Sequence, residues 1–418
     1  MPPRASVTAG ARAALIRRLR QPFALGGRRF RRLLAATFFN GSSMVGEMLL
    51  FGLAVYELSG STAWVGLSLA LYFAPNFFVG AIAGTIADSF DRARVLRTVE
   101  AALGINLLVI GALFMSGLAG LAVVLVLTLV SGVFRAAYNP ARSSYAFDLA
   151  GAERVVSALG TLNISVRFGQ LAGALVTGWV AAEAGIGTAY MVLAGAQALA
   201  LVSFGRQRAS PPAQAGAERR SMRAGLVGFF RELGANRPLL ILFAVTAAVE
   251  VFAFSFLTAL PDLAVDRLGL DAAGLGILHA ARSTGGIIGG VMMAIAGPRR
   301  RLGMIWLAIV AAFGLAVMAL GLAPNLPVAV VVTVTIAFCA VASDVLTQSM
   351  MQLAVPAELR GRAMGAWQVA VGFSPIGHLE MGLLAGAVGT AGALMFNGAA
   401  LVLVAIGAGA ASRRLRHM

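Results

Sequence analysis

Apolar runs about as long as a membrane is thick recur through this 418-residue sequence. A helix needs roughly 20 mostly apolar residues to cross a bilayer, and twelve stretches meet that requirement. They are residues 33–56, 64–83, 95–115, 121–138, 159–182, 187–205, 238–260, 275–295, 304–322, 328–346, 364–384 and 391–408. Composition agrees, because 12% of the residues are charged, whereas a soluble domain carries about 25%. The sequence predicts an all-α membrane protein with twelve transmembrane helices.

The positions of the arginines predict how this chain is oriented in the membrane. All 33 basic residues are arginine, and the net charge is +16. They collect in both terminal tails, in the central connection and in every second short connection, whereas the connections on the other side hold only Arg267. Positively charged loops stay in the cytoplasm, so both termini are expected there. The scattered arginines form no single patch, and no nucleic-acid partner is expected.

The central connection divides the chain into two related halves. It is rich in Pro, Ala, Gly, Gln and Arg, which is typical of a linker, and residues 221–233 have the apolar spacing of a helix lying on the membrane surface. Glycines at 173, 178 and 185 recur 204 residues later, at 377, 382 and 389, which favours two parallel repeats. The expected parts are a basic tail (1–32), a six-helix bundle (33–205), the linker (206–237), a second six-helix bundle (238–411) and a basic tail (412–418).

The connection after the second span holds the densest mixed-charge cluster, Gly84-Thr-Ile-Ala-Asp88-Ser-Phe-Asp91-Arg92-Ala-Arg94. A glycine, an aspartate four residues on and then a basic cluster resemble the loop motif of the major facilitator superfamily. Residues 55–67, 354–365 and 373–386 resemble its bacterial branch of enterobactin exporters and macrolide efflux proteins. The resemblance implies a monomeric transporter in the bacterial inner membrane. It also implies that Gly84, Asp88, Asp91, Arg92 and Arg94 latch the cytoplasmic side closed; the simpler interpretation is that they set topology and cap helices.

Charged residues inside the spans are the candidates for a central pathway, because a charge in hydrocarbon is costly. Glu47 and Arg167 lie at mid-depth in the first half, and Glu250 and Arg282 in the second. Each pair could neutralise its own charges, either as part of the mechanism or as a structural ion pair between helices. Further cavity candidates are Arg135, Asp344, Asn163, Gln170, His378 and Glu380, of which Arg135 and Asp344 could equally be anchors near the cytoplasmic surface. Asp262 and Asp266 are interpreted as exposed loop acids. Spans three, six, nine and twelve carry little or no charge, and in the resembled fold these are the outer supports.

Small residues in spans five and eleven indicate close helix packing. The positions are Gly169, Gly173, Gly178, Pro375, Gly377 and Gly382. Gly169 is followed by Gln170 where antiporters of the resembled superfamily often have proline, and this departure weakens the case for export. The single cysteine, Cys339, can form no internal disulfide and is interpreted as a packing residue.

Energy from ATP is not expected, because the paired glycines at 285–286 and 289–290 lie inside a span and lack a Gly-Lys-Ser/Thr sequence. We expect no cofactor, no metal site and no enzyme activity. The expected function is proton-coupled efflux of a small amphipathic organic compound, such as a drug, siderophore or secondary metabolite, with Glu47 as the coupling carboxylate. The alternatives are proton-coupled uptake of a nutrient or metabolite, and a non-transporting receptor or assembly protein on the same scaffold.

Overall fold

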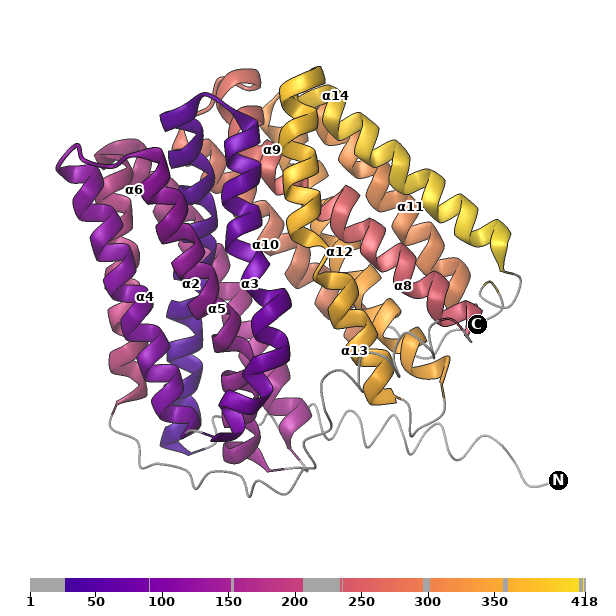
Figure 1. The fold of residues 1–418 in the computed structure, drawn as a ribbon, viewed down its shortest axis with the longest axis horizontal. Helices are drawn as coiled ribbons and strands as arrows, with labels where there is room; N and C mark the ends of the chain where they lie inside the picture. Colours follow the sequence, from indigo (N-terminus) through magenta and orange to yellow (C-terminus); the bar gives the residue numbers. More distant parts are fainter. Residues whose placement is uncertain are drawn as a thin grey trace.

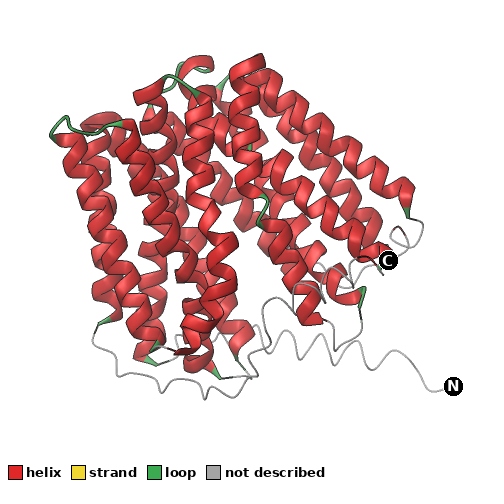
Figure 2. Cartoon of the chain, viewed as in Figure 1, coloured by secondary structure: helices red, strands yellow, loops and turns green. Residues whose placement is uncertain are grey.

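The structure is a computed structural model that describes residues 27–89, 91–151, 154–205, 234, 236–295, 301–355, 360–412 and 416, without the side chains of 77–89, 156 and 360–362. Across those residues every regular element is helical (Figure 2). The helices are α2 (Arg28–Ser59), α3 (Thr62–Ser89), α4 (Arg92–Met115), α5 (Leu121–Ala150), α6 (Val155–Phe204), α8 (Arg237–Val249), α9 (Phe256–Asp262), α10 (Ala272–Ile295), α11 (Leu302–Gly321), α12 (Leu326–Leu353), α13 (Arg360–Val371) and α14 (Ser374–Ala411), with the π-helical segments η1 (Glu250–Phe254) and η2 (Leu263–Arg267) flanking α9.

Eight helical stretches in the described part are long and apolar enough to cross a membrane. Two of them, in α6 and α14, contain one residue each with non-helical backbone, Gly185 at φ 82° and Gly389 at φ 78°. Glycine adopts a positive φ without the strain that a Cβ would bring. Gly185 and Gly389 form one of the three glycine pairs that are separated by 204 residues. Both halves therefore break a long helix at the same place. Figure 1 shows α14 turning back on itself.

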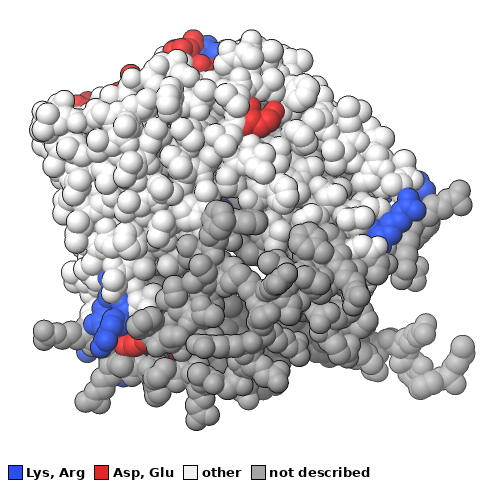
Figure 3. Space-filling model, in the orientation of Figure 1, with Lys and Arg blue, Asp and Glu red and all other residues white. Residues whose placement is uncertain are grey.

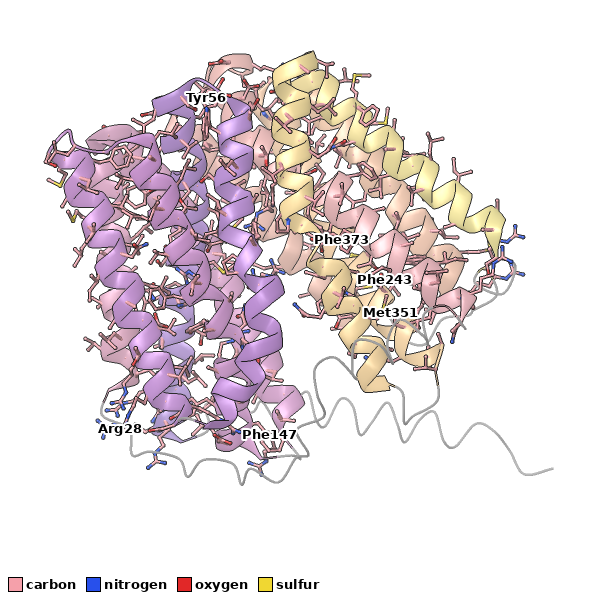
Figure 4. The ribbon with its side chains drawn as sticks, in the orientation of Figure 1. Arg28, Tyr56, Phe147, Phe243, Met351 and Phe373 are labelled. Carbon is pink, nitrogen blue, oxygen red and sulfur yellow. The ribbon has the colours of Figure 1, made fainter. Side chains whose placement is uncertain are left out.

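The helices form two groups, α2 to α6 and α8 to α14, here called the first half and the second half (Figure 1). The end of the molecule at which α2 begins, α6 finishes and α8 begins is called the linker end, and the opposite end is called the far end. Figure 4 labels Arg28 and Phe147 at the linker end and Tyr56 at the far end. The largest buried apolar cluster runs through both halves, whereas a second cluster, including Leu96 and Tyr145, belongs to the first half alone.

Many outward-facing side chains of the helices are large and apolar. Figure 3 shows few charged residues between the two ends on the visible face, with one acidic patch below the upper end. Large apolar side chains point outward from the helices, for example Trp179 at 62% and Ile295 at 75% exposure. Such side chains are expensive to expose to water and fit a lipid surrounding.

Several helices are longer than the sequence analysis expected. The fourth span was expected to end at residue 138, but α5 continues to Ala150, because Tyr138, Ala141 and Tyr145 bury themselves in the first-half cluster. The extension moves Arg135 from the cytoplasmic surface to the middle of its helix. The surface helix expected over 221–233 lies outside the described residues.

Candidate functional site

A buried ion pair lies inside the first half. Arg135 of α5 donates through Nε to Oε2 of Glu47 in α2 at 3.0 Å, and these side chains are 7% and 0% exposed. The hydroxyl of Tyr72 donates to the same oxygen at 3.3 Å. The other carboxylate oxygen, Oε1, is buried without a hydrogen-bond partner among the described residues.

The rest of the Arg135 guanidinium is held by its neighbours. It donates to Asn40 Oδ1 at 3.0 Å and to Ser43 Oγ at 3.1 Å. The amide of Asn40 donates to both oxygens of Glu100 at 3.1 Å, and Gln197 also donates to Glu100. These residues, together with Glu47 and Tyr72, are called the first-half network.

Glu100 and Gln197 are members of this network that were not predicted from the sequence. Glu100 is a buried acid in α4. The sequence did contain a signal for them, namely an acid, Glu100, in the nearly uncharged third span and a glutamine, Gln197, in the sixth.

The expected pairing of Glu47 with Arg167 is wrong. Glu47 faces Arg135, and Arg167 points out of the first half toward the second. A Cβ placed on Gly286 of α10 would lie 3.0 Å from Arg167 Nη1. The guanidinium of Arg167 therefore lies against the opposite half at Gly286.

A cavity of about 90 Å³ lies where the two halves meet beside Arg167. The first half contributes Arg167, and the second half contributes Arg282 of α10 and Asp344 of α12 as the other charged lining residues. The remaining wall includes Phe254, Phe256, Leu257, Gly286, Ile336, Ala337, Ala340 and Val341. The sequence analysis placed Asp344 in the central cavity or, alternatively, at the membrane surface; the structure places it in this cavity.

The expected pairing of Glu250 with Arg282 is also wrong. Between described residues no ion pair within 4.0 Å includes Arg282, Arg167 or Asp344. Arg282 Nε and Nη2 are buried and have no hydrogen-bond partner there. Glu250 is buried at the first position of η1, where the π-helical turn changes the direction of the residues that follow, and it does not line the cavity.

The other predicted cavity residues are distributed around the molecule. Gln170 is buried and accepts from Arg167 at 3.4 Å. Asn163 is exposed and accepts from Arg142 at 3.3 Å. His378 stacks on Phe73 of the other half, with ring centroids 5.1 Å apart, and shares a hydrogen bond with Thr258 at 2.9 Å.

Glu380 is not part of the cavity between the halves. It accepts from Asn397 at 2.8 Å and lines an open groove with Ile376, Leu379, Leu383, Leu384 and Ala387. His378 and Glu380 therefore point to different surroundings, as their two-residue spacing on a helix requires. The part of the chain that the structure describes contains no group of three His, Cys, Asp or Glu able to hold a metal ion.

The conspicuous glycines make two kinds of contact. A Cβ on Gly169 or Gly173 would overlap backbone atoms of α2 in the same half, and one on Gly377 would lie 2.5 Å from Val251 O of its own half. Gly178 and Gly382 instead face the opposite half: a Cβ there would lie 2.7 Å from Ala272 O and from Thr62 O, respectively. Pro375 occupies the first turn of α14, where its missing N–H costs little.

The charged cluster after α3 makes local contacts within the first half. Asp91 caps α4 by accepting from Ala93 N at 3.1 Å. Arg92 forms an ion pair with Asp148 at the end of α5, and Arg94 is exposed. The side chains of residues 77–89, which include Gly84 and Asp88, lie outside the described residues.

The two halves are joined at the far end by a phenol between two carboxylates. Tyr56 of α2 contacts Asp262 Oδ1 at 2.7 Å and Asp266 Oδ2 at 2.6 Å. Asp262 and Asp266 were interpreted as exposed loop acids. Asp266 is exposed and Asp262 is half-buried, but both lie in helical segments that extend the seventh span, and both contact Tyr56 of the first half. Between described residues, the hydrogen bonds and ring contacts that join the halves lie at the far end or at mid-depth.

Comparisons with known proteins give a consistent family. A family model described as the Major Facilitator Superfamily matches residues 33–377. The enterobactin exporter EntS of Escherichia coli O1:K1 is 26% identical over 391 residues, which are 90% of this chain and 92% of that protein; EntS of Shigella boydii serotype 18 gives the same values.

Solved structures share the fold at low sequence identity. A bacterial homologue of the human lysosomal transporter Spinster, in an inward-facing and unoccupied conformation, superposes with a TM-score of 0.70 at 17% identity, covering 93% of this chain and 97% of the other. The peptide transporter POT in complex with sulfate gives a TM-score of 0.72 at 14% identity, covering 93% of this chain and 95% of the other.

Proposed function

This chain belongs to the Major Facilitator Superfamily, and we propose that it is a monomeric, proton-coupled exporter of a small amphipathic organic compound in a bacterial inner membrane. The observation that carries the proposal is the buried Glu47–Arg135 pair, in which one carboxylate oxygen has no partner among the described residues. Bacterial exporters among the relatives support the direction and the membrane. A drug, siderophore or secondary metabolite would meet the description of the substrate.

We propose that the chain crosses the membrane twelve times with both termini in the cytoplasm. Support comes from the eight apolar helical stretches, of which those in α6 and α14 are each divided by a glycine and are long enough for two crossings at 1.5 Å per residue. Helices α3 and α10 are also long enough, at 28 and 24 residues. The linker end would be cytoplasmic, because arginines concentrate there.

Alternating access fits the way in which the halves meet. Contacts at the far end would close the outer side, so this arrangement would be open toward the cytoplasm. Rocking the halves about the mid-depth cavity would separate Tyr56 from its aspartates and bring the cytoplasmic ends together. Asp88, with Asp91, Arg92 and Arg94, is the proposed inner latch of that second arrangement.

Glu47 is the proposed proton carrier. Its Oε2 is held by Arg135 and Tyr72, whereas Oε1 is free to take a proton. Rocking the halves would change the groups that surround this carboxylate. The proposal is that Oε1 takes a proton in one arrangement and gives it up in the other, as proton coupling requires.

The test begins with a screen of amphipathic compounds for changed resistance in a bacterial host that lacks its own efflux pumps. The compound found is then followed in proteoliposomes with an imposed pH gradient. Glu47→Gln should retain exchange of the compound but lose accumulation driven by the gradient, whereas the exposed Glu57→Gln should keep both. Gradient-driven accumulation by Glu47→Gln would exclude Glu47 as the carrier and leave Glu250 and then Asp344 to be examined. Accumulation in the opposite direction would support uptake.

A further inference from the structure

The cavity between the halves presents two arginines and one acid. Arg167 reaches it from α6 and Arg282 from α10, so each half supplies one arginine. Neither guanidinium lies within 4.0 Å of a described carboxylate oxygen. Among the described residues, Arg167 has one long hydrogen bond, to Gln170 at 3.4 Å. With Asp344 as the only acid in the lining, the described cavity carries one positive charge more than it neutralises.

Two hydrogen-bond donors of Arg282, Nε and Nη2, are buried and lack an acceptor among the described residues. A buried donor left without a partner is costly, and more so when it is charged. Nε and Nη2 form one edge of the guanidinium fork, which matches the two oxygens of a carboxylate or a phosphate. A ligand anion would satisfy both donors and balance the excess charge.

The size of the cavity indicates which part of a ligand it takes. A volume of about 90 Å³ is roughly three times the share of one water molecule in the liquid. It is well below the ~300–1,000 Å³ of pockets that enclose a whole drug-sized ligand. One carboxylate or phosphate group fits this volume. Phe254, Phe256 and Leu257 on the same wall provide apolar surface beside it.

We propose that this cavity is an anion subsite that binds the acidic head group of an amphipathic organic anion. The inference rests on the proposed function and narrows its substrate class, because an amphipathic cation would meet two arginines balanced by only one acid in the described lining. It also gives substrate a structural role. An anion held by Arg167 and Arg282 bridges the two halves and favours the arrangement in which they are closest at mid-depth.

The test is equilibrium binding without any gradient. The full-length protein in phosphatidylcholine nanodiscs is titrated with 2-naphthylacetate, with its uncharged amide, and with 2-naphthylethylamine, all sharing one ring system. The acid should bind at least tenfold more tightly than the amide. Arg282→Gln and Arg167→Gln should each remove that preference, Arg282→Lys should retain part of it, and the exposed Arg31→Gln should leave it unchanged. Monodisperse elution identifies the variants that have folded; if either glutamine variant fails, the comparison rests on Arg282→Lys.

Three results would overturn the subsite. The first is an acid that binds no more tightly than the amide, including no measurable binding of either. The second is an acid preference that survives in the folded arginine variants. The third is loss of acid binding in nanodiscs containing phosphatidylglycerol, which would make a lipid head group the occupant.

The result is separable from the test of the proposed function. Selective anion binding without gradient-driven accumulation would leave the subsite in place and overturn the exporter. Gradient-driven accumulation of a cation or a neutral compound, with no preference for the acid probe, would support the exporter and overturn the subsite.

Discussion

Two arginines inside the spans have opposite surroundings. Arg135 has a carboxylate, an amide oxygen and a hydroxyl around its guanidinium, and all of these groups come from α2. Arg282 has buried donors with no partner among the described residues. A satisfied charge is typical of a fixed structural or coupling element, whereas an unsatisfied one is typical of a place where something else binds.

The Glu47–Arg135 pair should show strong energetic coupling. Removing one partner leaves an uncompensated buried charge, which costs about 3–5 kcal/mol. Glu47→Gln and Arg135→Gln should each destabilise the protein by that order, and the double variant should lose less than the sum of the two. The measurement is a double-mutant cycle from unfolding in mixed micelles. The matched cycle of Glu47→Gln with Arg167→Gln should be additive within about 0.5 kcal/mol. Coupling to Arg167 instead of Arg135 would contradict the observed pairing.

At the scale of the helices, equivalent glycines perform equivalent tasks in the two halves. Gly173 and Gly377 allow close packing inside a half, and Gly178 and Gly382 allow close packing between the halves. In each half, one glycine makes a contact inside the half, which is permanent, and a glycine five residues later makes a contact between the halves, which has to open during transport. Alanine substitutions can distinguish the two kinds of contact.

Alanine at Gly173 or Gly377 should weaken folding, because the added Cβ would press on backbone atoms of a neighbouring segment in the same half. Alanine at Gly178 or Gly382 should change the fold little but separate the halves at the far end. Melting temperature reports the first effect. The second is read from spin-label distances between Leu118→Cys and Leu322→Cys at the far end, in a Cys339→Ala background. Gly195→Ala, whose Cβ would meet nothing within 4 Å, is the control. Equal loss of stability from all four variants would contradict the division.

For the molecule as a whole, the far-end contact joins the halves through one side chain. The phenol of Tyr56 in the first half lies 2.7 Å from Asp262 and 2.6 Å from Asp266 of the second half. Between described residues, no arginine lies within 4.0 Å of either aspartate, and the nearby Arg267 donates to Gly321 O. The phenol is therefore the group that ties these two aspartates to the first half.

Removing the phenol should therefore loosen the far end. Tyr56→Phe keeps the ring but loses both contacts to the aspartates, so the Leu118–Leu322 spin-label distance should lengthen. Tyr190→Phe, which removes a buried hydroxyl without a hydrogen-bond partner among the described residues, is the matched control and should leave the distance unchanged. An unchanged distance in Tyr56→Phe would show that other contacts close the far end.

The sequence by itself determined the membrane class, the family and the repeat. Long apolar runs leave no alternative solvent for the chain. Gly185 and Gly389 could be matched from spacing alone, because a backbone break that needs a positive φ depends on a single residue type. The charged residues at mid-depth could likewise be identified one by one, since a charge in an apolar span stands out wherever it points.

Only the tertiary structure decided which charges meet. Each residue along a helix rotates its side chain by about 100°, so a partner depends on the true length and rotation of both helices, and apolar runs define neither. Because α5 extends to Ala150, Arg135 lies in the middle of the helix, where it pairs with Glu47. The placement of one half against the other brought Tyr56 to aspartates 206 and 210 residues away and put Arg167 beside Arg282. Those contacts arise from packing between surfaces that no local sequence pattern records.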